Sequence, residues 1–213
     1  MKWTELSPAW QACLEEAWTA HCTGSVPVGA AVVDGDGKII SRGRNRIREL
    51  EAPPGLAYDN QLAHAELNAL LALCRDAANV HSCAIYTSLE PCPLCMGAIY
   101  MSGVRKIYYA AEDAYAGSTN LLGKTWYLAR KPIQVSGPQR GGLAEFACAL
   151  HIEFCLRAYP LPNPVVEMER NVFPAGVALA EKVRARGLFQ QWAAAGLETA
   201  SVFDTFQDFF SDR

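Results

Sequence analysis

Two short motifs, His64-Ala65-Glu66 and Pro91-Cys92-Pro93-Leu94-Cys95, constrain this chain more than any other feature. One histidine and two cysteines are ligands that Zn²⁺ takes in proteins. Three protein ligands leave one tetrahedral position open, and an open position is typical of catalytic rather than structural zinc sites. The fold must therefore bring two distant segments together at one point.

The surrounding patterns indicate where these motifs lie. We expect a helix over residues 62–77, a strand over 84–87, a helix over 91–102 and a strand over 105–110. His64 then lies at the start of one helix, and the two cysteines lie in the first turn of the other. Thiolates in a first turn meet the positive end of the helix dipole, which lowers their pKa and favours metal binding. Two such helices on one face of a sheet would bring the three ligands together.

The rest of the first 159 residues alternates strand and helix patterns. A helix is expected after Ser7-Pro8, and an apolar hairpin over residues 28–40 is predicted around a turn of Asp and Gly. A last strand is expected at 133–135, after a connection long enough for a crossover helix, so the last two strands can be parallel. Residues 143–159 carry a helical stripe.

The segment 160–164 is rich in proline and marks a predicted boundary. We expect a domain over residues 1–159 and a helical extension over 160–213, with 177–195 largely helical and interrupted at Gly187. The extension is too rich in aromatic residues to remain in water, so it should pack on its own domain, on a partner subunit or over the mouth of the active site as a lid. Its last aromatic stripe consists of Val202, Phe203, Phe206, Phe209 and Phe210.

Composition limits the classes of function. The chain has 213 residues, half of them apolar, which suits a globular fold with a sizeable core. Its formal net charge of −3 provides no global attraction to nucleic acid. No signal peptide and no membrane-spanning stretch is recognisable, so a reducing, cytoplasmic setting without a membrane partner is expected.

Glu66 distinguishes the possible readings of the motifs. A C-x-x-C pair alone could be a redox pair or half of a closed structural zinc site, with Cys83 or His81 as the fourth ligand. The chain would then be a non-catalytic, zinc-stabilised binding module. Such a site does not require Glu66, which in an open site could take a proton from water and return it to a leaving amine. The histidines other than His64 are expected to be structural.

The order H-x-E followed by P-C-x-x-C is the signature of zinc-dependent nucleobase deaminases. The chain resembles the cytidine/deoxycytidylate deaminase superfamily, and within it the branch of tRNA adenosine deaminases and guanine deaminases. This resemblance implies an α/β fold, a three-layer α/β/α sandwich around a mixed five-stranded sheet, here with the extra C-terminal helical segment. The matching segments are 26–30, 43–46, 63–66, 89–99, 116–117 and 120–122.

The resemblance also implies roles for individual residues. His64, Cys92 and Cys95 would bind one Zn²⁺ per chain, and Glu66 would move protons. Asn45 would hydrogen-bond a purine ring. Further substrate contacts would come from the side chain of Val28, the backbone N–H of Ala65, and Glu90.

Three departures from the family pattern bear on the substrate. Residues 143–160 contain Arg157 as their only arginine or lysine, the loop after the fourth strand is shortened and has Tyr115 where a basic residue is common, and the 46–61 loop is long. We therefore expect a zinc-dependent hydrolytic deaminase of a small purine-like base or nucleoside, guanine-type first, that releases ammonia. The alternative is a tRNA adenosine deaminase that converts A to I. Because proteins of this family are usually dimeric or larger, the resemblance implies a homodimer or a larger homo-oligomer.

Overall fold

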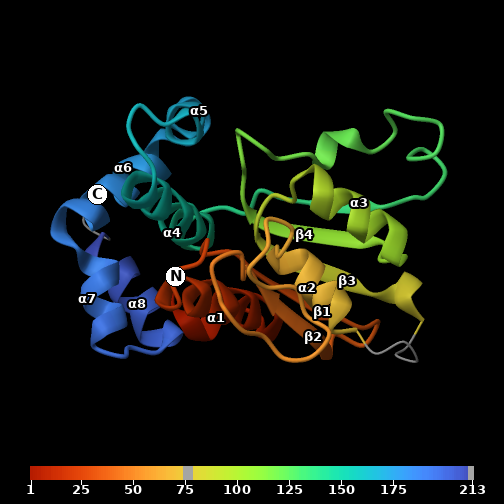
Figure 1. Cartoon of the computed structure of the whole chain (residues 1–213), viewed down its shortest axis with the longest axis horizontal. Helices are drawn as coiled ribbons and strands as arrows, with labels where there is room; N and C mark the ends of the chain where they lie inside the picture. Colours follow the sequence, from red (N-terminus) through yellow and green to blue (C-terminus); the bar gives the residue numbers. More distant parts are fainter. Residues whose placement is uncertain (74–78, 211–213) are drawn as a thin grey trace.

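A five-stranded mixed sheet forms the centre of the molecule. The structure is a computed structural model that describes residues 1–73 and 79–210 (Figure 1). The strand order is β2-β1-β3-β4-β5; β1 is antiparallel to β2 and β3, whereas β3, β4 and β5 run parallel. This confirms the expected mixed sheet. The strands are β1 (Gly29–Val33), β2 (Ile39–Arg44), β3 (Ala84–Leu89), β4 (Lys106–Ala111) and β5 (Gln134–Ser136).

Helices cover both faces of this sheet. α1 packs on β1, β2 and β3 and also contacts α4, which packs on β4. α2 packs on β1 and β2 and contacts α3. The helices are α1 (Pro8–Cys22), α2 (Ala65–Leu71), α3 (Pro93–Ser102), α4 (Gly142–Ala158), α5 (Pro164–Val172), α6 (Pro174–Arg186), α7 (Leu188–Ala194) and α8 (Thr199–Phe209), with short 3₁₀ turns η1 (Trp3–Glu5), η2 (Val80–Ser82) and η3 (Thr119–Leu121).

Two glycines let helices approach the hairpin closely from opposite sides. A Cβ on Gly29 would lie 2.1 Å from the Cys13 carbonyl oxygen of α1, and a Cβ on Gly43 would lie 2.2 Å from the Ala69 nitrogen of α2. Gly43 pairs with Ala30, the residue after Gly29, and successive strand residues face opposite sides of a sheet. Glycine at both positions therefore sets how deeply α1 and α2 sit on the strands.

α2 begins later than the predicted helix over 62–77. Asn60 accepts hydrogen bonds from the backbone N–H groups of Leu62 and Ala63, through its side-chain and main-chain oxygens respectively. This local turn competes with helix formation, so His64 becomes the N-cap of α2 instead of an internal residue. The predicted end of the helix, at 74–77, lies outside the described residues.

The connection between β4 and β5 also differs from the expectation. Parallel pairing of the two strands is confirmed. In the described chain, however, residues 112–133 contain η3 and a series of turns in place of a crossover α-helix. A connection of this length can cross between parallel strands without regular helix.

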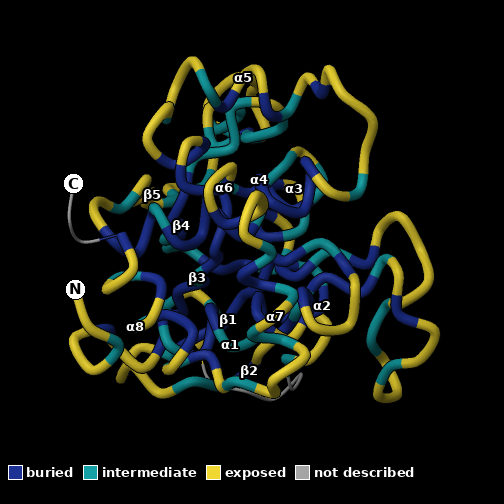
Figure 2. Tube along the Cα trace, turned by 90° about the vertical axis from the view of Figure 1, so that its left-hand side faces the viewer, coloured by how far each residue is buried: buried dark blue, intermediate teal, exposed yellow. Residues whose placement is uncertain are grey.

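The segment after residue 160 folds into α5, α6, α7 and α8, and the core runs into it without interruption (Figure 2). Phe146 of α4 makes edge-on ring contacts with Phe203 and Phe206 of α8, with centroids 5.2 and 5.3 Å apart. The indole of Trp18 donates a hydrogen bond to the Leu197 carbonyl at 3.0 Å. The division into two domains at residue 160 stays a prediction.

α5 was not expected from the sequence. The proline-rich break was recognised, but Asn163 and Pro164 also form a helix start. The Asn163 side chain accepts a hydrogen bond from the Val165 N–H at 2.9 Å, and Pro164 occupies the first helical position. None of the described helices is both long and apolar enough to cross a membrane.

Candidate functional site

His64, Cys92 and Cys95 meet where the first turns of α2 and α3 come together. His64 and Cys92 are the N-caps of the two helices, and Cys95 is the third residue of α3. The Nδ1 atom of His64 lies 3.5 Å from Cys92 Sγ and 3.4 Å from Cys95 Sγ, and the two sulfur atoms are 3.7 Å apart. The structure therefore brings together the three residues that the motifs single out.

The spacing of these atoms fits a tetrahedral zinc site. Zinc–sulfur and zinc–nitrogen bonds at tetrahedral angles would separate two sulfurs by about 3.8 Å and a sulfur from a nitrogen by about 3.6 Å. The observed separations of 3.7, 3.5 and 3.4 Å are close to these values. The donor set and its geometry therefore suit Zn²⁺.

A closed site with a fourth protein ligand does not form from the two residues considered. The Nδ1 atom of His81 lies 2.9 Å from the Gly103 carbonyl oxygen, and the Cys83 thiol donates to the Asn79 carbonyl. Over residues 1–73 and 79–210, the histidine, cysteine and acidic side chains whose donor atoms cluster closely enough to hold a metal are the same three. This favours an open site.

Glu66 lies beside the cluster and is 3% exposed. One carboxylate oxygen accepts a hydrogen bond from the Thr87 hydroxyl at 3.2 Å, and the other accepts from the Cys95 thiol at 3.2 Å. Thr87 belongs to β3, so the sheet and α3 together orient the carboxylate. Thr87 cannot be identified from the sequence, because an isolated threonine in a strand carries no signal that separates it from packing residues.

The site shifts the acidity of its own groups. The hydrogen bond between the two cysteines lowers the pKa of Cys92 to about 4, and the contact with His64 acts in the same direction. The pKa of Cys95 is raised by this same interaction with Cys92 and by burial. Burial also raises the pKa of Glu66. Cys92 is thus disposed to ligate as a thiolate, and Glu66 is disposed to exchange a proton.

A small cavity of about 150 Å³, which we call the inner pocket, opens over the cluster. Val28, Asn45, Ala65 and Glu90, the four predicted substrate-binding residues, all line it together with His64, Glu66 and Cys92. The sequence expectation thus placed these residues around one cavity. Whether they contact a substrate stays a prediction.

Two of these side chains are held in position by neighbours. The Asn45 side-chain oxygen accepts hydrogen bonds from the Ser25 hydroxyl at 2.8 Å and from the Ile47 N–H at 3.1 Å. Glu90 accepts from the Thr119 N–H at 3.1 Å. A Cβ on Gly117 would lie 2.3 Å from a Glu90 carboxylate oxygen, so glycine is needed at position 117.

His151, which was expected to be structural, is one of the residues that line the inner pocket. It belongs to α4, whereas the three predicted metal ligands lie at the starts of α2 and α3. Burial lowers its pKa, but Cys155, Asp113 and Glu169 outweigh this effect and raise the value to about 9. Helical periodicity places His151 on a buried stripe, and nothing in the sequence indicates which cavity that stripe borders.

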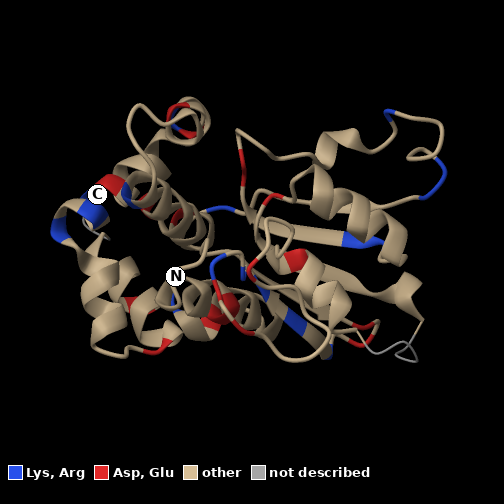
Figure 3. Ribbon diagram, viewed as in Figure 1, with Lys and Arg blue, Asp and Glu red and all other residues tan. Residues whose placement is uncertain are grey.

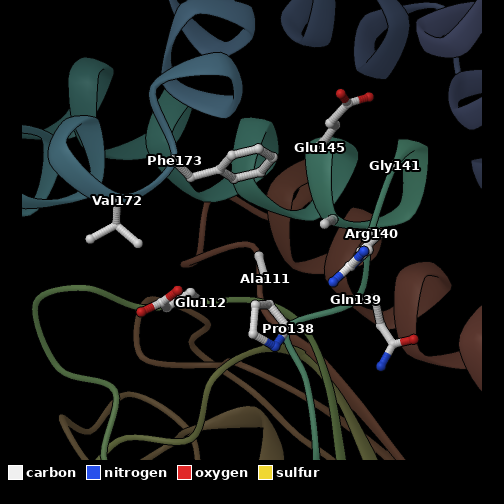
Figure 4. A pocket seen from close by; sticks show the side chains of 10 residues that line it. Ala111, Glu112, Pro138, Gln139, Arg140, Gly141, Glu145, Val172 and Phe173 are labelled. Carbon is white, nitrogen blue, oxygen red and sulfur yellow. The ribbon is translucent and has the colours of Figure 1, made fainter.

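Figure 4 shows a different cavity, of about 240 Å³, between the end of β4, the segment before α4 and the end of α5. Its charged lining residues are Glu112, Arg140 and Glu145. It shares no lining residue with the inner pocket and contains none of the predicted ligands. It is therefore separate from the candidate site.

Comparison with known proteins adds independent information. The family model of the cytidine and deoxycytidylate deaminase zinc-binding region matches residues 4–111. Guanine deaminase of Bacillus subtilis (strain 168) is 38% identical over 110 residues, which cover 48% of this chain and 65% of that protein. tRNA-specific adenosine deaminase of Aquifex aeolicus (strain VF5) is 37% identical over 106 residues, covering 49% of this chain and 64% of that protein. The chain spans just under two thirds of the length of these two relatives.

A solved structure of a guanine deaminase from Nitrosomonas europaea has a similar fold, with a TM-score of 0.51 and 30% sequence identity. The superposition covers 70% of this chain and 84% of that one. The sequence match contains both predicted motifs, and these are the segments that meet at the inner pocket. A match of this extent shows that the chain belongs to the cytidine and deoxycytidylate deaminase zinc-binding family.

Proposed function

We propose that this protein is a zinc-dependent hydrolytic deaminase of a purine-like base or nucleoside. The observation that carries the proposal is the position of Glu66, buried next to a three-ligand cluster at the base of the inner pocket. A structural zinc site is closed by four protein ligands and does not need a buried carboxylate beside them. A hydrolase does need such a carboxylate, because the water molecule must lose a proton as it attacks.

His64, Cys92 and Cys95 would hold one Zn²⁺. The metal would supply Lewis-acid chemistry that lowers the pKa of a water molecule toward neutrality. Glu66 would take a proton from the attacking water and deliver it to the departing amino nitrogen. The ring C–NH₂ bond is thereby replaced by a C–O bond, and ammonia leaves. Thr87 would keep the carboxylate oriented during both transfers.

The inner pocket supports a guanine-type ring as the first candidate. Because both hydrogen bonds described for the Asn45 side chain use its oxygen, its amide N–H groups can donate to the substrate. Glu90 and Asp113 line the same pocket and can only accept when ionised. Guanine presents oxygen and nitrogen acceptors as well as donors, whereas adenine carries an amino donor in place of the oxygen.

A tRNA adenosine deaminase is the second candidate, because the relative from Aquifex aeolicus is almost as similar as the guanine deaminase. RNA binding depends on basic side chains that converge on the site. Figure 3 shows Lys and Arg distributed over the sheet, the turns after η3 and the C-terminal helices, and the described lining of the inner pocket contains neither residue type. This distribution favours a small molecule.

The test is ammonia release by zinc-loaded protein from guanine, adenine, cytosine, their nucleosides and a tRNA anticodon stem. We expect a guanine-type compound to give the highest kcat/KM. Glu66→Gln should lower kcat by at least about 10²–10⁴-fold while the protein keeps one zinc per chain, because the residue moves protons and does not ligate.

Metal content and circular dichroism provide the control for that variant. Unchanged ammonia release by Glu66→Gln would reject the mechanism. Zinc retention together with no turnover of any substrate by the unmodified protein would favour the binding-module alternative. The predicted homo-oligomer is checked separately by the mass of the protein in solution.

A further inference from the structure

A second, larger cavity adjoins the inner pocket. It has a volume of about 540 Å³, and we call it the outer cavity. Its far wall comes from α4 and from the segment 159–165, which leads into α5. The residues that line both cavities are Val26, His64, Asp113, Ala116 and His151. The two cavities are therefore neighbouring compartments that meet beside a predicted metal ligand.

The outer cavity is largely apolar, and packed aromatic rings and prolines form one of its sides. Two guanidinium groups lie over the Phe154 ring, with Arg48 at 5.0 Å and Arg157 at 5.5 Å from its centroid. The ring of Tyr159 packs against it edge-on at 6.1 Å. Val165 and three prolines of the segment 159–165 complete this side.

The charges around the outer cavity disfavour a phosphate. Lys and Arg are missing from its described lining, since Arg48 and Arg157 lie over the Phe154 ring without bordering the cavity. Asp113 stands at the junction of the two compartments. Glu169, which is buried and accepts a hydrogen bond from the Ala114 N–H at 3.2 Å, adds a second carboxylate close to this junction. His151 also borders both cavities and has a pKa raised to about 9, but its Nε2 atom lies 3.7 Å from the Cys155 sulfur and it interacts with both of these carboxylates. A phosphate would therefore lose its hydration and meet two carboxylates against one imidazolium that already has partners.

We propose that the outer cavity is a subsite for an uncharged substituent on the ring that is deaminated, so that the preferred substrate is a nucleoside. The inner pocket would hold the heterocycle, and the outer cavity would hold the sugar. This inference rests on the proposed function, and it goes further by ranking the nucleoside above both the free base and the nucleotide.

Binding energy from a non-reacting part of a substrate can be used to orient the reacting part, so the loss of that part lowers kcat as well as affinity. We therefore expect kcat/KM for guanosine to exceed that for guanine by about 10-fold or more. Guanosine monophosphate should be poorer than guanosine by about 100-fold, because its phosphate meets two carboxylates against the single imidazolium of His151, with no Lys or Arg in the described lining.

Filling the outer cavity provides the first test. Val165→Trp should lower kcat/KM for guanosine by about 10-fold and leave that for guanine within about 2-fold, because the added ring occupies only the outer compartment. Met168→Trp is the matched control, since Met168 lies on the same helix, is exposed and does not line the cavity. It should change neither value.

A gain of function provides the second test. Tyr115 is exposed and lines the outer cavity. Tyr115→Lys should raise kcat/KM for the monophosphate by about 10-fold at low salt, with little change for guanosine, and the gain should fall as salt rises.

The outcomes separate this inference from the proposed function. If guanine is deaminated as fast as guanosine and Val165→Trp affects both alike, the subsite is wrong and the deaminase proposal stands. If no compound is deaminated, the proposed function fails. Calorimetric titration with guanosine and with guanine then tests the subsite by itself. Tighter binding of guanosine, lost only in Val165→Trp, would still support the subsite, and equal binding of both ligands would overturn it.

Discussion

In the proposed deaminase, the direction of the Asn45 side-chain amide would decide which substrate groups the inner pocket recognises. Its oxygen already accepts from Ser25 and from the Ile47 N–H, so the amide nitrogen is the part left to meet a substrate. Ser25 is fully buried, and its hydroxyl also accepts a hydrogen bond from the Arg48 N–H at 3.3 Å. The identity of the recognised group thus depends on a residue that need not touch the substrate.

Ser25→Ala should therefore loosen Asn45 and weaken substrate binding. Loss of one buried hydrogen bond is expected to lower kcat/KM by about 10-fold, mainly through KM. Steady-state kinetics on the best substrate of the panel checks this, and zinc content should stay at one per chain. A fall in kcat with unchanged KM would show that Ser25 acts on the reaction itself.

His21 predicts an acid-sensitive contribution to stability. It is 5% exposed, stacks on Trp18 with ring centroids 5.0 Å apart, and its pKa is lowered to about 4, first by burial and then by Arg157. The unfolded chain binds this proton near pH 6.5 and the folded chain only near pH 4. The free energy of unfolding should therefore not depend on His21 above pH 6.5. It should fall by about 3 kcal/mol in total as the pH drops from about 6.5 to about 4.

His21→Phe should remove that part of the pH dependence, since the new ring keeps the stacking and cannot be protonated. Urea unfolding of both proteins at several values between pH 7 and pH 4 measures the difference in the free energy of unfolding. A difference that does not change with pH would contradict the assignment.

At the scale of elements, α2 is positioned by a glycine in the strand beneath it. Gly43→Ala would place a methyl group 2.4 Å from the Ala65 carbonyl oxygen, at the helix turn that carries Glu66. We expect destabilisation by about 1–3 kcal/mol, together with weaker zinc retention, because α2 must move away from the sheet.

Gly97→Ala is the matched control for this prediction. Gly97 lies within α3, and a Cβ there would meet nothing within 4 Å. Alanine should be neutral or stabilising by up to about 1 kcal/mol. Thermal unfolding and metal content of both variants, measured side by side, test the expectation. Equal effects at the two positions would show that the packing of α2 is tolerant.

The elements also show which features could be predicted from the sequence. The hairpin and a helix over most of residues 91–102 follow from local signals, although α3 begins at Pro93. The parallel pairing of β4 and β5 agrees with the length of their connection, and the meeting of His64 with both cysteines agrees with the order of the two motifs. The early turn at Asn60 and the start of α5 at Asn163 were missed because capping side chains compete with periodicity over only a few residues. Thr87 and His151 could not be recognised, because their roles depend on contacts between residues far apart in the chain.

At the scale of the whole molecule, α8 is part of the core and not an accessory. Phe203 is fully buried between Trp3 and Phe146, with centroid distances of 5.8 and 5.2 Å. Phe203→Ala should cost about 3–5 kcal/mol, as expected for a buried aromatic residue. Phe209, on the same helix, is 44% exposed, and its replacement by alanine should cost less than about 1 kcal/mol.

Urea unfolding monitored by tryptophan fluorescence compares the two variants. A small effect at Phe203 would mean that the helices after residue 160 contribute little to the stability of the rest. A large effect would support the prediction that truncation after Pro160 exposes apolar surface and leads to aggregation or a changed oligomeric state.

The uninterrupted core has a consequence for how the molecule would respond to the binding of the proposed zinc ion. Buried residues from α1 through α8 form one cluster, although α8 supplies no residue to the metal site. A ligand that binds only the folded state stabilises every part that unfolds together with its site. Stripping the metal should therefore speed amide hydrogen exchange in α8 as well as in α2, and the far end of the chain would report on events at the inner pocket.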